Sequence, residues 1–116
     1  MKDFKKLLIW QKGMDLVDRV YDFVGLLPQD EKYGIRAQLT RAAVSIPLNI
    51  AEGSAKSSER DYARFLEMSL GSAYEVETLL IVVERRKWVS AEVVGELLNW
   101  IDEEQRMLLA FIKKLR

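Results

Sequence analysis

Cysteine and histidine are both absent from this 116-residue sequence. Without cysteine the chain can form neither a disulfide framework nor a thiolate metal site. Without histidine it lacks the commonest general base, the commonest transition-metal ligand and the usual pH switch. These absences exclude Ser-His-Asp, Cys-His and Glu-x-x-His constellations. The sequence therefore predicts a protein that is not an enzyme and that holds no cofactor or metal.

Turn-forming residues and long apolar runs are also scarce. The two prolines and six glycines argue against disorder and long loops. No apolar run approaches the roughly 20 residues that a membrane span needs. The start, "MKDFKKLLIWQKG", returns to charge after four apolar residues, unlike a signal peptide. We expect a single soluble, cytoplasmic domain over residues 1–116, with no membrane contact.

Neither sign of charge is in excess, because 18 basic residues balance 18 acidic ones. The chain as a whole is therefore not a polycation that binds nucleic acid by bulk charge, and any basic surface has to be local.

Apolar residues recur at spacings of three and four, which predicts helices over about 5–27, 31–52, 58–87 and 91–115. Ser58 and Ser90 suit helix N-caps, and Gly53 suits the position just past a helix C-terminus. The short connections favour an all-α, antiparallel up-down-up-down four-helix bundle. In the first helix the expected inner face is Trp10, Met14, Val17, Tyr21 and Val24.

The second predicted helix has apolar residues on two sides, although a helix in an isolated bundle buries only one stripe. The surplus residues are Ala37, Val44, Leu48 and Ala51, and Met68, Leu79 and Val82 lie outside the main seam of the third helix. We expect the bundle to associate with copies of itself.

The stretch "RAAVSIPLNIAEG" places Pro47 inside the second helix, which predicts a kink or a local break near residues 43–47. Polar residues of this helix fall on one arc beside the apolar seam. They can be structural, with Ser45 or Asn49 satisfying freed backbone groups and Arg41 pairing with an acid of the third helix. They can instead contact a ligand or RNA. The arc consists of Gln38, Arg41, Ser45, Asn49 and Glu52, and the candidate acids are Glu67, Glu75 and Glu77.

Four stretches, "FKKLLIWQK", "YGIRAQLTRAAVSIPLNIAEG", "FLEMSLGSAYEVE" and a leucine-rich last helix, resemble the four-helix-bundle proteins encoded in bacterial 23S rRNA intervening sequences. The resemblance covers nearly the whole chain. It implies a homopentamer without established enzymatic activity, for which a role in RNA binding has been supposed. A similar family, the accessory variability determinants of diversity-generating retroelements, implies a basic pentamer that binds RNA and a reverse transcriptase.

Three basic clusters are candidate RNA contacts, and ordinary solvated surface is the alternative for each. The clusters are Lys2, Lys5, Lys6 and Lys12; Lys56, Arg60 and Arg64; and Arg85, Arg86 and Lys87. In a ring each cluster would be repeated on every subunit and act multivalently.

The function that this pattern favours is a non-enzymatic, homo-oligomeric accessory protein that binds RNA or a nucleic-acid-processing protein. A protein-binding scaffold without a nucleic-acid role is the alternative. A metal-dependent helical hydrolase is a third class, whose metal ligands would be Glu52, Glu67, Glu75 and Glu77.

Overall fold

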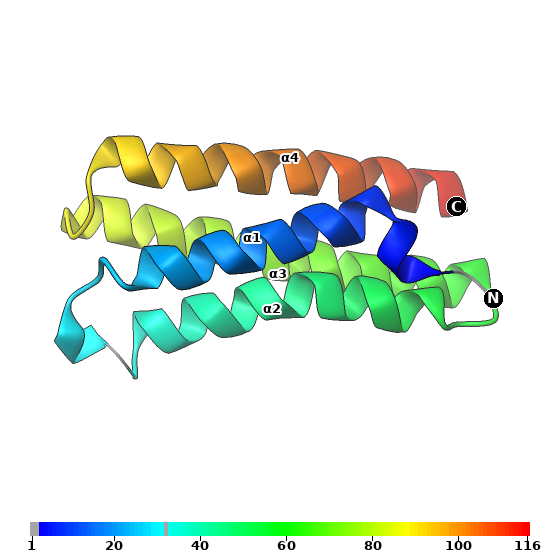
Figure 1. Ribbon diagram of the computed structural model, residues 1–116. Coiled ribbons are helices and arrows are strands. Elements are labelled where there is room, and N and C mark those ends of the chain that lie inside the picture. The colour runs from blue at the N-terminus through cyan, green and yellow to red at the C-terminus, as the bar shows by residue number, and fades with distance from the viewer. Residues whose placement is uncertain (1–2, 32) are drawn as a thin grey trace.

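Four long helices form an antiparallel bundle in a computed structural model that describes residues 3–31 and 33–116 (Figure 1). Each helix packs against its two neighbours, and α1 and α4 close the bundle. The described residues include no β-strand, so the predicted all-α class is confirmed. The elements are η1 (Phe4–Lys6), α1 (Leu8–Val24), η2 (Gln29–Glu31), α2 (Ile35–Ser54), α3 (Glu59–Arg86) and α4 (Ala91–Leu115).

The helix termini match the sequence signals at α3 and α4 but not at α1 and α2. The hydroxyls of Ser58 and Ser90 accept hydrogen bonds from the backbone N–H groups three residues on, as N-caps do. The predicted starts of the first two helices, at residues 5 and 31, are wrong because short 3-10 turns precede both α1 and α2. Lys32, at the start of the second predicted helix, lies outside the described residues.

The inner face of α1 is displaced from the predicted one. Leu16 and Val20 are buried, whereas Met14 and Tyr21, which were expected inside, are exposed. Gly13 lies on this buried stripe, where a Cβ would lie 3.1 Å from the Glu104 carboxyl of α4 and 3.4 Å from the Cβ of Pro47. The missing side chain leaves room for the Glu104 carboxyl beside the stripe that faces α2 and α4.

Helix α2 continues through Pro47 without interruption, so the predicted local break is wrong. The turn around the proline is tied to α3, because the buried Ser69 hydroxyl donates a 2.8 Å hydrogen bond to the Ile46 carbonyl. Gly53 lies inside α2 and has no positive φ, so its predicted role beyond the helix end is wrong. It is a close-approach site instead, since a Cβ there would lie 2.8 Å from the Cβ of Phe65.

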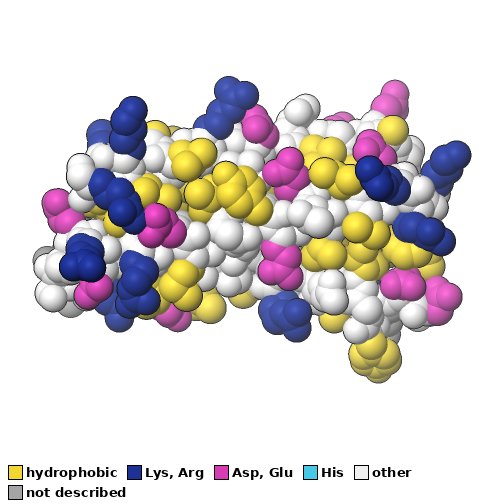
Figure 2. Space-filling view, turned by 180° about the vertical axis from the view of Figure 1, so that it is seen from behind, with side chains coloured by type: hydrophobic (Ala, Val, Ile, Leu, Met, Phe, Trp, Pro, Cys, Tyr) yellow, Lys and Arg dark blue, Asp and Glu magenta, His cyan; other side chains and the backbone are white. Residues whose placement is uncertain are grey.

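Apolar side chains interrupt the charged surface on the face that α3 provides, which is seen from behind in Figure 2. Four apolar residues that the sequence placed outside the seams are exposed, namely Val44, Leu48, Met68 and Val82. Tyr74 and Ile81 of α3 are exposed as well. Within the described ranges, none of the helices combines the length and apolar character of a membrane span.

Candidate nucleic-acid interface

The bundle brings two of the predicted basic clusters to the same end. The N-terminal segment, the α2–α3 turn and the C-terminus of α4 all lie there (Figure 1). Cations about 50 residues apart in the sequence therefore become neighbours. We call this region the basic end and define it by Lys5, Lys6, Lys56, Arg60 and Arg64, all of which are exposed.

A groove of about 950 Å³ separates η1 from the α2–α3 turn at the basic end. Lys5 and Lys56 lie on its two sides, and Phe4 and Ala55 supply apolar surface between them. Asp3 is an acidic residue in its lining, and its carboxylate accepts a hydrogen bond from the Lys5 backbone N–H. The groove thus combines cations with apolar surface in a concave shape.

Several cations of the basic end lie over aromatic rings. The Lys56 ammonium is 4.7 Å from the centroid of the Phe65 ring, and the Arg64 guanidinium is 5.0 Å from the same centroid. Lys5 lies 6.0 Å from the centroid of Phe4. Such contacts position a cation while leaving its outer side open to solvent, where it can meet a phosphate.

The C-terminal cations Lys113, Lys114 and Arg116 extend the basic end, and sequence reasoning missed them. The Arg116 guanidinium pairs with Glu67 of α3 at 2.6 Å, whereas Lys113 and Lys114 are exposed. An antiparallel order of four helices places the end of the last helix beside the start of the first. That topological signal was available in the sequence.

The other predicted cations lie elsewhere. Arg85, Arg86 and Lys87 end α3 at the opposite end of the bundle. Lys12 lies on α1, forms an ion pair with Glu103 and is 5.8 Å from the Trp100 ring. Lys2 lies outside the described residues. The structure therefore joins the first two clusters only in part and keeps the third apart.

The predicted polar arc on α2 is divided between the surface and the interior. Asn49 is buried, and its amide donates hydrogen bonds to the Ser45 carbonyl at 2.9 Å and to the Ser45 hydroxyl at 3.1 Å. Gln38, Arg41 and Glu52 are exposed, as is Glu75 of α3.

Arg41 forms no ion pair with any residue in the described ranges, so the expected pair with an acid of α3 is absent. The reason is its position on the outer side of α2. There Arg41 lines a shallow hollow with Tyr21, Val44 and Leu48.

Glu104 is a buried carboxyl group that sequence reasoning also missed. Its side chain is 1% exposed, and neither carboxyl oxygen has a hydrogen-bond partner among the described residues. Burial raises the pKa of Glu104 to about 8, and the nearby Lys12 cation partly opposes that shift. Its spacing from Ile101 and Leu108, at three and four residues, placed it on the inner face of α4.

The acids required for a metal centre are not gathered. Glu67 pairs with Arg116, and Glu77 accepts a 2.8 Å hydrogen bond from the Gln105 amide. Across residues 3–31 and 33–116, no group of three or more histidine, cysteine, aspartate or glutamate side chains is placed to hold a metal ion. The arrangement gives the hydrolase alternative no support.

The fold and the basic end define a class: an all-α four-helix bundle that carries a cationic, aromatic-lined groove at one end. The chain belongs to the 23S rRNA-intervening sequence protein family, which it matches over residues 5–110. The resemblance inferred from the sequence is therefore confirmed.

A crystal structure of a protein of unknown function from the S23 ribosomal protein family of Bacteroides thetaiotaomicron has the same fold. It superposes with a TM-score of 0.85 at 24% identity, covering 91% of this chain and 99% of the other. Comparison with curated proteins gives no match.

Proposed function

We propose that this protein is a non-enzymatic RNA-binding protein that acts as a homo-oligomer and contacts RNA through its basic end. The observation that carries the proposal is the meeting of Lys5 and Lys56, about 50 residues apart in the chain, across one groove. A chain with zero net charge binds a polyanion only where its cations are locally in excess.

The groove suits the two parts of a nucleotide. Exposed cations on its sides can neutralise phosphates, and the Phe4 ring inside it offers a surface on which a base can stack. The Phe4 ring is itself held edge-on against Trp10, with the ring centroids 5.3 Å apart. The binding surface is thus partly organised before any ligand arrives.

Titration of a fluorescent structured RNA with a single-stranded loop, at two salt concentrations, tests the proposal. Affinity should fall as salt rises, and each phosphate contact on a single strand contributes about −0.7 to the slope of log K against log salt. The variant K5A/K56A should bind more weakly, with a slope shallower by about 1.4 for each subunit engaged. The matched control R85A/R86A removes the same charge at the opposite end and should bind like the parent protein.

Two results would contradict RNA binding at the basic end. Negligible affinity even at low salt would remove RNA as a ligand. Equal weakening by K5A/K56A and R85A/R86A would show that binding follows total charge rather than the groove.

Self-association is the second part of the proposal, and the resemblance to the family makes five the expected number of copies. It is supported by apolar side chains that the bundle leaves exposed on α2 and α3, among them Leu48 at 52% and Tyr74 at 47%. Exposed apolar surface of this kind on neighbouring helices is typical of contacts between subunits.

Light scattering after size-exclusion chromatography gives the subunit number directly. Leu48→Asp should reduce the mass, because a carboxylate would have to be buried in the contact. Leu109→Asp, on an exposed position of α4, is the matched control and should leave the mass unchanged. A monomeric parent protein would refute self-association.

A protein-binding scaffold is the alternative function, and the same exposed apolar residues on α2 and α3 favour it. Failure of RNA binding together with a monomeric parent protein would leave these faces available for a different polypeptide. The RNA titration separates the two functions, because a scaffold without a nucleic-acid role should show no salt-dependent affinity for RNA, whatever its subunit number.

A further inference from the structure

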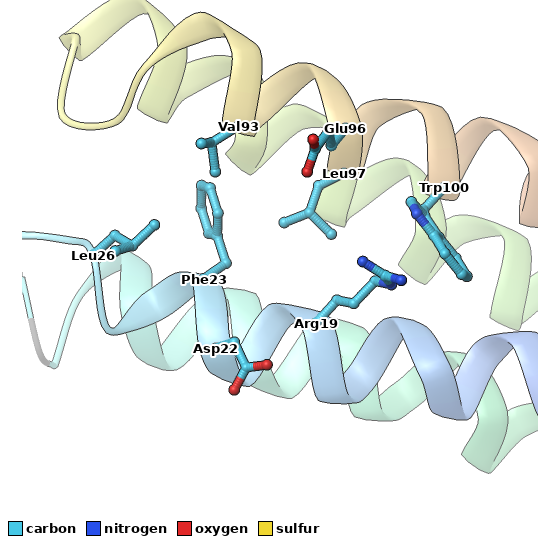
Figure 3. Close-up of a pocket in the computed structure, with 8 residues that line it drawn as sticks. All are labelled: Arg19, Asp22, Phe23, Leu26, Val93, Glu96, Leu97 and Trp100. Atoms are coloured by element: carbon cyan, nitrogen blue, oxygen red, sulfur yellow. The ribbon is translucent and has the colours of Figure 1, made fainter.

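A second groove lies between α1 and α4, away from the basic end. Phe23 of α1 and Leu26, in the turn after α1, point across it toward Val93 and Leu97 of α4 (Figure 3). Its volume is about 330 Å³. Phe23 and Leu97 form a buried floor, whereas Leu26 on the wall is 56% exposed. The groove is open along the helices and large enough for one or two apolar side chains.

Arg19 and Trp100 close one end of this groove. The Arg19 guanidinium lies 3.9 Å from the centroid of the Trp100 ring. Figure 3 shows the Arg19 side chain extending toward Trp100. Within the described residues Arg19 has no carboxylate partner. The guanidinium therefore packs on an aromatic face, and its single positive charge offsets only part of the negative charge of the four acids around it, Asp15, Asp18, Asp22 and Glu96.

Acids that form no ion pair lie at the edge of the groove and beside it. Asp22 and Glu96 line it, and Asp15 and Asp18 lie beside Trp100 in the adjoining surface hollow. None of these four carboxylates forms an ion pair in the part of the chain that the structure describes. An apolar floor inside a negative rim repels a phosphate backbone and attracts cations that carry apolar groups.

We propose that the α1–α4 groove binds a helical segment of a partner protein that carries an apolar side chain flanked by lysine or arginine residues. The apolar side chain enters between Phe23 and Leu97, and the flanking cations meet Asp22 and Glu96. A groove between two helices accepts such a segment along its length. This site is independent of RNA binding, because it lies on different residues and has the opposite charge.

Fluorescence anisotropy with a labelled 18-residue peptide tests the proposal. The peptide carries leucine at positions spaced by three and four and lysine elsewhere, and two comparison peptides replace lysine by glutamate or leucine by serine. The leucine–lysine peptide should bind at 0.15 M salt with a Kd of about 10–100 µM, since one or two buried side chains and a few exposed ion pairs supply the affinity. Neither comparison peptide should bind in this range.

The variant D22K/E96K should weaken binding by about tenfold or more, because two attractions become repulsions. Asp22→Lys places a cation in the last turn of α1, where the helix dipole favours it. The matched control E59K/E84K makes the same change of charge on exposed positions of α3 and should stay within about twofold of the parent protein. Thermal melts of both variants establish that they are folded.

Three outcomes would overturn the proposal. The first is no binding of the leucine–lysine peptide at 1 mM, and the second is equal weakening by the two double variants, which would indicate general attraction to an acidic protein. The third is a change in subunit number of D22K/E96K in light scattering, which would assign the groove to a second copy of this chain.

Discussion

Glu104→Gln should make the protein more stable than the parent near neutral pH and leave stability unchanged near pH 4.5. Glutamine has nearly the same shape as glutamate but cannot ionise. The parent protein, in contrast, has to keep a carboxyl group protonated among α1, α2 and α4. The Glu104 carboxyl lies beside Gly13, where a Cβ would be 3.1 Å from it. Ile46 and Pro47 of α2 pack against the same position of Gly13.

The magnitude follows from the difference in pKa between the two states. The pKa of Glu104 is about 8 in the folded protein, against an ordinary value of 4.5 for an exposed glutamate. Between these values the folded state holds a proton that the unfolded state has lost, so the free energy of unfolding falls by about 1.4 kcal/mol per pH unit as the pH rises. The contribution of Glu104 protonation to the free energy of unfolding is therefore complete below pH 4.5 and is lost by about pH 8. At pH 7 the loss is about 3 kcal/mol.

Denaturant unfolding followed by circular dichroism, at fixed protein concentration and at several pH values from 4.5 to 9, measures this directly. The difference in unfolding free energy between Glu104→Gln and the parent protein should be near zero at pH 4.5 and should grow up to about pH 8. Glu96→Gln, an exposed carboxyl on the same helix, is the matched control and should show only a few tenths of a kcal/mol. Parallel curves for Glu104→Gln and the parent protein would refute the reasoning.

Lys12 provides a second check on the same group. The Lys12 cation lowers the pKa of Glu104, in opposition to burial. Lys12→Ala should therefore raise that pKa further. In this variant the free energy of unfolding should continue to fall as the pH rises above 8. If the free energy of unfolding of this variant instead stopped falling at a pH below 8, Lys12 would not act on Glu104 through its charge.

Three further substitutions test the packing. Gly53→Ala should lower the free energy of unfolding by about 1–2 kcal/mol in denaturant titrations, because the new Cβ would force α2 away from Phe65. An unchanged free energy of unfolding would show that the two helices move apart freely. Ser69→Ala should cost about 1 kcal/mol by the same measurement through loss of the buried bond to Ile46, whereas Ser72→Ala, with no such bond, should cost less. Lys87→Gly should raise the melting temperature and the free energy of unfolding, the latter by about 0.5–1 kcal/mol, because Lys87 has a left-handed φ of 58° that glycine adopts without strain. A lower melting temperature would contradict this.

The sequence predicted the fold class because helical periodicity and N-cap signals are local. Ser58 and Ser90 act within three residues, so their roles could be read directly. The inner face of α1 could not be read in this way, because two apolar stripes, through Leu16 and through Met14, run along the same helix. Packing decided between them, since the stripe through Gly13 and Leu16 has room for the buried Glu104 carboxyl of α4.

The candidate site was predictable in its residue types but not in its arrangement. Lys5 and Lys56 were recognised as basic, yet only the folded chain brings them to one groove. The predicted ion pair of Arg41 with an acid of α3 is wrong, because the positions of polar residues around one helix do not show which of its sides a neighbouring helix covers. Glu104 was overlooked because a charged residue at a core position contradicts the usual pattern of burial.

The position of the two chain ends has a practical consequence for the measurements described above. The first described residues and the C-terminus of α4 lie at the same end of the bundle as the α2–α3 turn (Figure 1). A polyhistidine tag or a fluorescent fusion at either end would therefore lie next to Lys5 and Lys56 and could compete with RNA or cover the groove. A label attached at the turn between α3 and α4, near Val89, would lie at the far end of a molecule 44 Å long. From there it would report RNA binding at the basic end without obstructing it, whereas the α1–α4 groove, which Val93 lines, lies close to this turn.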